Sequence, residues 1–257
     1  MDFAIRRAEM AERNWNDPDC REAVAAWHNA SRTFDYQYMF QWLDLPIIQD
    51  PQDVCALQEV IWTYKPDAVI ETGVARGGSL VLSASILATM GYSEFLRGKT
   101  PAARKVIGVD IDIRPHNRAA LESHALAPMI DLVQGSSIDP LVVDRVSELL
   151  GGDKKALVIL DSNHTRDHVF DELRLYSRFV PKGSAILVMD TGIEFAPVET
   201  FNVVRHWGPG NSPLTAVDEF LASAAGADFH KDLSIEKRHI LTCAPQGLLV
   251  RGPGTTE

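Results

Sequence analysis

The sequence is poor in cysteine and has no excess of basic side chains. Its three cysteines, Cys20, Cys55 and Cys243, stand far apart among 257 residues and form no C-x-x-C pair. This spacing argues against a disulfide framework and a thiolate zinc site, and it predicts buried thiols in a reducing compartment. The 25 basic and 35 acidic side chains give a formal net charge of -10. Duplex nucleic acid and anionic membranes would on balance be repelled, so neither is an expected partner.

Long apolar segments are also missing. The N-terminus, MDFAIRRAEMAERNWND, alternates charged with apolar residues and lacks the apolar core of a signal peptide. No window reaches the roughly 18 apolar residues of a membrane span. We therefore expect a cytoplasmic protein, and the hydrophobic fraction of 46% is ample for a globular core.

Two regions of the chain differ in pattern. Residues 1–51 combine an amphipathic helix pattern with an aromatic-rich stretch that Pro46 and Pro51 interrupt. We interpret this region as an N-terminal helical and aromatic arm. Residues 52–257 carry a regular alternation of strand and helix patterns and are expected to form the main domain.

Five short apolar runs in the main domain are typical of buried parallel strands. They cover residues 68–72, 105–110, 130–136, 156–161 and 184–190, and helix-length segments separate most of them. This alternation predicts a doubly wound α/β sheet. Near the C-terminus, RHILTCA, the turn PQG and LLVRG are typical of an antiparallel hairpin. Together they predict a mostly parallel seven-stranded sheet with a terminal antiparallel hairpin, the Rossmann-like arrangement of S-adenosylmethionine-dependent methyltransferases.

The first strand runs into a glycine-rich turn, VIETGVARGGSLV, where a helix should begin. Ligands of such sheets bind beyond the carboxyl ends of the strands. Gly73, Gly77 and Gly78 permit a sharp turn and a close approach of backbone to ligand, beside the free N–H groups of the helix. The spacing is neither a dinucleotide fingerprint nor a Walker motif. Glu71 favours S-adenosylmethionine, because a carboxylate attracts the sulfonium and would repel a pyrophosphate; the alternative is that Glu71 only caps or pairs.

Polar side chains also end the second and third strands. Asp110 ends the second strand, where its two oxygens can accept hydrogen bonds from both ribose hydroxyls. Ser136 and Ser137 end the third strand, and their hydroxyls either meet the adenine edge or cap the next helix. These positions would complete a nucleoside site beside the glycine turn.

The fourth and fifth strands end on Asp161 and Asp190, and His164 and Glu194 follow shortly after. Carboxylates at the ends of adjacent parallel strands lie close together and repel unless a cation or a proton lies between them. Mg²⁺, which prefers oxygen ligands, is the simplest occupant; the alternative is a helix cap and a salt-bridge partner. His164 is a candidate base for a substrate hydroxyl, a metal ligand or a structural histidine.

The combined motifs resemble the cephalosporin hydroxylase / rhamnosyl O-methyltransferase family. The resemblance runs from about residue 34 to residue 250 and rests on FQWLDLPIIQDPQDVCALQEVIW, KPDAVIETGVARGGSLVLSAS, LDSNHTRDHVFDELRLYSRFV, VMDT and HWGPGNSPLTAVDEFL. It implies a class I methyltransferase fold, S-adenosylmethionine as methyl donor, Mg²⁺ dependence and a homo-oligomer.

The resemblance also implies roles for individual residues. It assigns the donor-binding turn to Glu71, Gly73, Gly77, Gly78 and Ser79. It assigns ribose binding to Asp110 and the metal to Asp161 and Asp190. One position departs from the pattern, because some relatives have Glu-Asp where this chain has Met189-Asp190. Glu194, His164, Thr191 or water would then complete the metal shell.

We therefore expect a Mg²⁺-dependent O-methyltransferase that acts on a hydroxyl of a sugar, of rhamnosyl type, or of a natural-product glycoside, in polysaccharide or antibiotic biosynthesis. Asp161 and Asp190 would hold the metal, and His164 would accept the proton. Two alternatives stay open. One is a methyltransferase or hydroxylase component that modifies a β-lactam nucleus, and the other is a cofactor-binding partner protein without turnover.

Overall fold

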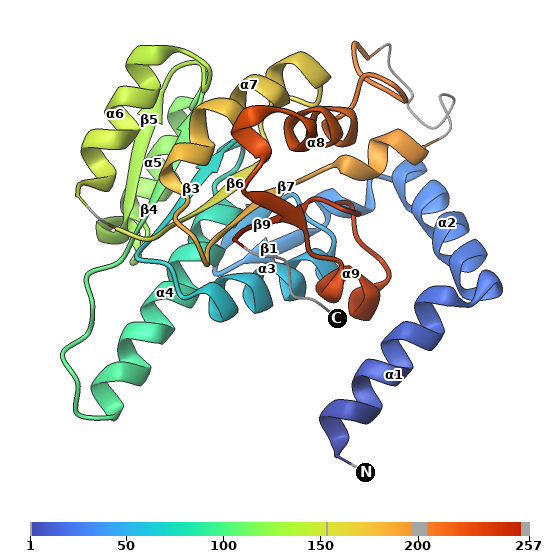
Figure 1. Ribbon diagram of the computed structural model, residues 1–257. Coiled ribbons are helices and arrows are strands. Elements are labelled where there is room, and N and C mark those ends of the chain that lie inside the picture. Colours follow the sequence, from blue (N-terminus) through green and yellow to red (C-terminus); the bar gives the residue numbers. More distant parts are fainter. Residues whose placement is uncertain (1, 153, 197–204, 253–257) are drawn as a thin grey trace.

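A seven-stranded sheet organises the computed structural model, which describes residues 2–152, 154–196 and 205–252 (Figure 1). Its strands lie in the order β5, β4, β3, β6, β7, β9, β8. Strands β3 to β7 run parallel, and β8 and β9 are antiparallel at one edge. The bounds are β3 Ala68–Thr72, β4 Lys105–Asp110, β5 Ile130–Gln134, β6 Ala156–Leu160, β7 Ala185–Val188, β8 Phe229–Lys231 and β9 Leu248–Arg251. The expected doubly wound sheet with antiparallel terminal strands is confirmed.

The direction of winding reverses at β3. From β3 the chain adds β4 and β5 on one side, and then returns to add β6 and β7 on the other. Thr72, the last residue of β3, pairs with Val109 of β4 and with Leu160 of β6. The crossovers that leave β3 and β6 therefore diverge, which opens a crevice beyond these strand ends, where α/β sheets bind ligands.

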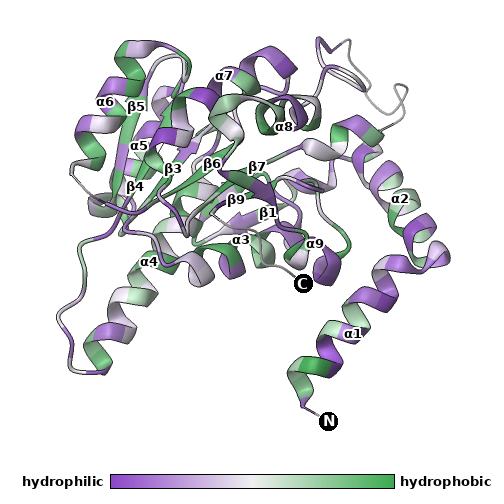
Figure 2. Cartoon of the chain, in the orientation of Figure 1, coloured by the Kyte–Doolittle hydropathy of each residue, from purple (hydrophilic) through white to green (hydrophobic). Residues whose placement is uncertain are grey.

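Helices cover both faces of the sheet because successive strand residues point to opposite sides. On one face lie α3 (Pro51–Tyr64), α4 (Gly78–Leu96), α5 (Pro115–Ser123) and α9 (Ser234–His239). On the other lie α6 (Pro140–Leu150), α7 (Arg166–Tyr176) and α8 (Pro213–Ala222). Apolar residues concentrate on the strands and on the inner sides of these helices (Figure 2).

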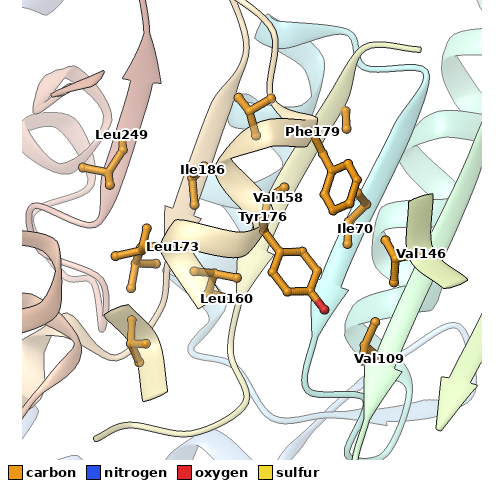
Figure 3. Close-up of a cluster of buried hydrophobic side chains, with 14 of the residues drawn as sticks. Ile70, Val109, Val146, Val158, Leu160, Leu173, Tyr176, Phe179, Ile186 and Leu249 are labelled. Carbon is orange, nitrogen blue, oxygen red and sulfur yellow. The ribbon is translucent and has the colours of Figure 1, made fainter. Parts of the chain in front are cut away.

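Residues of α7 and the turn after it form the centre of one apolar layer. Leu173, Tyr176 and Phe179 lie over Ile70 of β3 and Val158 of β6 (Figure 3). Most of these side chains are fully buried, and each such burial stabilises the fold by roughly 1.5–3 kcal/mol. The apolar layers on the two faces of the sheet hold β3 and β6 in place beneath the crevice.

Helix α4 is long and strongly apolar. Among the described residues it is the one helix whose length and hydropathy would allow it to cross a membrane. The expectation that no segment is long and apolar enough to span a membrane is therefore wrong for this helix. Nine of its nineteen residues are nevertheless buried, including Leu80, Val81 and Leu87, so it packs against the sheet as a core helix.

The N-terminal region consists of α1 (Phe3–Asn16), α2 (Pro18–Thr33) and a two-stranded hairpin, β1 (Phe40–Trp42) and β2 (Leu45–Ile47). Helix α1 has no buried residue and contacts α9, where Glu12 pairs with Lys237 at 2.9 Å (Figure 1). The hairpin is different, because Leu45 and Ile47 are buried in the core and the carbonyl of Pro46 lies against Gly78 at the start of α4. The end of this region is therefore fixed beside the glycine turn.

Two local expectations are wrong. The segment RHILTCA is not a strand, because α9 ends at His239 and the buried Asp53 carboxylate accepts hydrogen bonds from Thr242 Oγ1 (2.5 Å) and Cys243 N (2.9 Å). Strand β8 instead forms from residues 229–231. The thiols also differ from the expected three buried ones, since Cys55 is exposed and Cys20 and Cys243 are partly exposed.

Candidate active site

The glycine turn joins β3 to α4 and touches the end of β6. Gly73 has a φ of 95°, and a Cβ on it would lie 2.0 Å from the backbone carbonyl oxygen of Asp161. Gly77, with a φ of 88°, is the residue before α4. Only glycine combines this conformation with this close approach. The structure thus places the turn and Asp161 in contact, as the convergence of strand ends requires.

Glu71 lies beneath the turn and is only 1% exposed. Its Oε1 accepts a hydrogen bond from the Ser79 hydroxyl, whereas its Oε2 has no partner among the described residues. Burial raises the pKa of Glu71 to about 7 despite that hydrogen bond. A cation above the turn would stabilise this carboxylate in its charged form.

Asp110 accepts hydrogen bonds from the backbone of the glycine turn. Its Oδ2 accepts hydrogen bonds from Val74 N (2.8 Å) and Ala75 N (3.1 Å), and its Oδ1 accepts one from Asp112 N (3.0 Å). A carboxylate offers about four acceptor positions, so one on Oδ1 stays open for a ligand hydroxyl. Asp110 therefore both fixes the turn and faces the crevice.

A cavity of about 200 Å³ lies where these elements meet. Its wall includes Gly73, Asp110, Ser136, Ser137, Asp161 and His168. The serines were expected either to meet an adenine or to cap the next helix. Capping is wrong, because Asp139 is the N-cap of α6 and accepts a hydrogen bond from Leu141 N.

A second cavity, of about 300 Å³, adjoins the first through Asp161. Asp190 lies on its wall, and the Gln49 side-chain amide donates a hydrogen bond to Asp161 Oδ2 at 3.0 Å. Burial raises the pKa of Asp161 well above its ordinary value, and the charges of Asp190 and Glu71 raise it further. Ala75, Asp161 and Ser162 line both cavities, and Asp161 is the one acid among them. Its acidic neighbours favour a proton or a cation beside it.

His164 lies on the second cavity beside Asp190. Its Nε2 is 3.4 Å from Asp190 Oδ2, and its ring meets that of Trp207 edge to face, with centroids 5.4 Å apart. This is an ion-pair distance, so Asp190 would stabilise a His164 imidazole that has taken up a proton. The arrangement suits a histidine that accepts a proton from a ligand.

Glu194 does not line the cavity that contains Asp161 and Asp190, so its expected role as a metal ligand is wrong. The short helix η4 (Thr191–Phe195) carries it to the start of α8. There its carboxylate accepts hydrogen bonds from Gly210 N (3.0 Å), Ser212 Oγ (2.5 Å) and Thr215 Oγ1 (3.0 Å). Glu194 thereby anchors the segment that follows Trp207.

The donor set of the second cavity fits a hard divalent cation. In the described part of the chain no group of three or more His, Cys, Asp or Glu side chains has the geometry of a metal centre. Mg²⁺ is usually held by one or two carboxylates and retains several waters, so Asp161 and Asp190 suffice. Burial and the charge of Asp190 raise the pKa of Asp161, and a divalent cation between the two carboxylates would offset both effects.

Much of the second cavity comes from the N-terminal region, namely Ser31, Arg32, Gln37, Tyr38, Ile48, Gln49 and Asp50. Sequence reasoning gave no role at the site to Arg32, Gln49 or Asp50. Burial raises the pKa of Asp50, and the charge of Asp190 raises it further. Pro46 and Pro51, which bracket a short rigid stretch, were a signal in the sequence that this segment has a fixed place.

The strand order, the glycine turn and the acids at the strand ends define a Rossmann-like methyltransferase fold. The chain belongs to the rhamnosyl O-methyltransferase/CmcI family, whose model matches residues 34–252. Rhamnosyl O-methyltransferase of Mycobacterium tuberculosis strain H37Rv is 29% identical over 201 residues, which are 77% of this chain and 73% of the relative. That of Mycobacterium leprae strain TN is 26% identical over 211 residues and 82% of each chain.

Solved structures of similar fold contain Mg together with S-adenosylmethionine or S-adenosylhomocysteine. The structure of CmcI with Mg and S-adenosylmethionine matches with a TM-score of 0.54 at 18% identity, and covers 84% of this chain and 78% of that one. MycE, a methyltransferase of mycinamycin biosynthesis, in complex with Mg and S-adenosylhomocysteine matches with a TM-score of 0.50 at 16% identity, over 89% of this chain and 55% of that one. At these identities the likeness shows the shared fold.

Proposed function

We propose that this protein is an S-adenosylmethionine-dependent O-methyltransferase that uses Mg²⁺ and acts on a sugar hydroxyl of rhamnosyl type. One observation carries the proposal: two adjoining cavities share Asp161, one lined by the glycine turn and Asp110, the other by Asp190 and His164. A donor and an acceptor can thus bind on the two sides of one carboxylate. Family membership and the rhamnosyl O-methyltransferase relatives support the same reaction.

The smaller cavity holds the methyl donor. Asp110 accepts hydrogen bonds from the ribose hydroxyls, and Ser136 and Ser137 face the adenine. The glycines of the turn make room for neighbouring protein atoms, Gly73 for the Asp161 carbonyl and Gly78 for that of Pro46, and so fix the turn beside the methionine part of the donor. Buried Glu71 lies behind the sulfonium. The sulfonium charge offsets the cost of burying the Glu71 carboxylate.

The larger cavity holds the acceptor hydroxyl beside Asp161 and Asp190. Mg²⁺ bound to these carboxylates would supply a Lewis acid that lowers the pKa of that hydroxyl. His164 accepts the hydroxyl proton, and Asp190 stabilises the imidazolium that forms. The acceptor oxygen then forms a bond to the methyl carbon as the carbon–sulfur bond breaks, and S-adenosylhomocysteine leaves with the electron pair. The protein contributes mainly alignment, since the donor is already activated.

The test combines donor binding with transfer. The purified protein is titrated with S-adenosylhomocysteine with and without Mg²⁺, and then assayed for methyl transfer to methyl rhamnoside and to matched deoxy analogues. We expect donor binding, and transfer that needs Mg²⁺ and one particular hydroxyl. Donor binding without transfer to any acceptor would indicate a cofactor-binding partner protein, and transfer to a β-lactam nucleus alone would indicate antibiotic tailoring.

A further inference from the structure

Asp190, the proposed metal ligand after β7, has a left-handed backbone conformation. Its φ of 56° lies in a region that residues with a Cβ seldom occupy unless their surroundings hold them there. The residue before it is still tied to the sheet, because Met189 N donates a hydrogen bond to Leu160 O at 2.9 Å. Beyond Met189 the chain leaves the sheet, so contacts with other segments must fix the direction of the Asp190 carboxylate.

The segment that joins α9 to β9 holds the two residues after Asp190. Gly192 N donates a hydrogen bond to the Cys243 carbonyl at 2.9 Å. Thr191, which is fully buried, donates a hydrogen bond from its hydroxyl to the Pro245 carbonyl at 2.6 Å. A Cβ on Gly192 would lie 3.1 Å from the Cys243 carbonyl oxygen, so the two segments are in close contact. The position of the Asp190 turn therefore depends on the position of this segment.

Asp53 of α3 in turn holds the same segment. Its side chain is only 2% exposed, and its two oxygens accept hydrogen bonds from Thr242 Oγ1 at 2.5 Å and from Cys243 N at 2.9 Å. Thr242 Oγ1 also accepts a hydrogen bond from Ala244 N at 3.0 Å. Burial raises the pKa of Asp53 to about 6, and the two hydrogen bonds keep it from rising further. The carboxylate is therefore charged above pH 7, and its hydrogen bonds are strong.

Cys243 and Asp190 line the larger cavity, whereas Asp53 lies behind its wall and can influence it through the segment that it holds. We infer that Asp53 positions the Asp190 carboxylate for the divalent cation by fixing residues 242–245. Without this anchor the turn can relax from its left-handed conformation and move the Asp190 carboxylate relative to Asp161. Asp53 is thus a positioning residue. The inference rests on the proposed function, because it requires a cation bound by both aspartates of the site.

The experiment measures metal binding rather than turnover. The affinity of the full chain for Mn²⁺ is determined by electron paramagnetic resonance titration, and its affinity for S-adenosylhomocysteine by calorimetry. Asp53→Ala removes both acceptors that hold the segment. We expect it to weaken Mn²⁺ binding about 10-fold, as is typical when a residue that orients a metal ligand is lost. Donor affinity should stay unchanged, because the smaller cavity is lined by residues of other segments.

Two further positions separate positioning from a general loss of stability. Asp67→Ala removes a carboxylate that accepts a hydrogen bond from Lys155 N at 3.0 Å, just before β3 and β6 begin. It should lower the melting temperature without changing Mn²⁺ affinity. Thr242→Val removes one of the two donors to Asp53 and should weaken Mn²⁺ binding about 3-fold, whereas Thr242→Ser keeps that donor and the affinity.

The outcomes for the inference and for the proposed function differ. Unchanged Mn²⁺ affinity of Asp53→Ala, or an equal loss in Asp67→Ala, would overturn the inference and leave the proposed function standing. Should Asp53→Ala fail to fold, the comparison of Thr242→Val with Thr242→Ser decides, and equal affinities of these two variants would overturn the inference. If wild type binds no Mn²⁺, the metal-dependent function falls with it.

Discussion

The two cavities are built in different ways, although they share Asp161. The donor cavity is formed by residues at the ends of consecutive strands, from Gly73 to His168, and backbone groups of its turn are held by Asp110. The acceptor cavity joins α2 and the segment after the β1–β2 hairpin to Asp161, Asp190 and Cys243. Under the proposed function, the donor would therefore bind to residues of the sheet, whereas the acceptor would also contact the N-terminal region.

The largest expected effect comes from Asp161, which lines both cavities. We expect Asp161→Asn to lower kcat/KM on the order of 10³-fold, because several kcal/mol of Lewis-acid assistance is lost with the metal. Folding should be intact, since the change removes a buried charge and keeps the shape. Activity against Mg²⁺ concentration and the melting temperature are measured together. Asp144→Asn, an exposed acid of α6, is the control, and full activity of Asp161→Asn in chelator would contradict the account.

Glu71→Gln tests the buried charge of the donor side. Folding raises the pKa of Glu71 from 4.5 to about 7, so the native state binds more protons than the unfolded state in this interval. The contribution to stability is present below pH 4.5 and is lost as pH rises through 7. The stability of the variant relative to wild type should therefore rise by about 3 kcal/mol between pH 5 and pH 8. Denaturant unfolding at both pH values measures it, and a constant difference would show that Glu71 does not titrate as described.

His164→Ala tests proton transfer on the acceptor side. We expect the rate of transfer to fall about 10²-fold, because a positioned base is lost. Donor affinity should not change, since His164 lies on the acceptor cavity. Added imidazole should restore part of the rate. Failure of imidazole to restore any activity, with the fold intact, would assign His164 a structural role.

Asp110→Ala tests the donor cavity, because this change should lower donor affinity, which His164→Ala should leave unchanged. The loss of the acceptors for Val74 N, Ala75 N and the ribose should weaken S-adenosylhomocysteine binding about 30-fold. Asp112→Ala, its exposed neighbour, is the matched control. Equal affinities of the two variants in calorimetry would count against the ribose role.

Gln49→Leu should have the smallest effect, and it tests whether the two cavities bind their ligands independently. The change removes the amide that donates to Asp161 Oδ2 from the N-terminal region. We expect the KM for the acceptor to rise about 5-fold, which corresponds to about 1 kcal/mol or one net hydrogen bond, with donor affinity unchanged. Initial rates at varied acceptor concentration measure this, and a parallel loss of donor affinity would show that the cavities are not independent.

The sequence predicted the sheet and the strand-end acids because both follow local rules. Strands β3 and β4 have the predicted bounds, since continuous apolar runs end at the polar residues Thr72 and Asp110. Asp161 and Asp190 likewise follow directly from the ends of adjacent parallel strands. The principle that parallel strand ends gather at one edge was sufficient to place them together.

The remaining parts depend on contacts between distant segments. RHILTCA has a strand-like composition, but the buried Asp53 carboxylate holds Thr242 and Cys243 in another conformation. Glu194 lies four residues after Asp190, yet the turn at Asp190, with a φ of 56°, and η4 direct it to α8. Gln49 reaches Asp161 across 112 positions of sequence, and no periodicity encodes such a contact.

The most direct test of the central claim is a crystal structure with S-adenosylhomocysteine and Mn²⁺, whose anomalous signal locates the ion. We expect the adenosyl group between Gly73, Asp110 and Ser137, and the ion between the carboxylates of Asp161 and Asp190. A nucleoside bound elsewhere, or an ion held by neither aspartate, would contradict a single site shared by the two cavities.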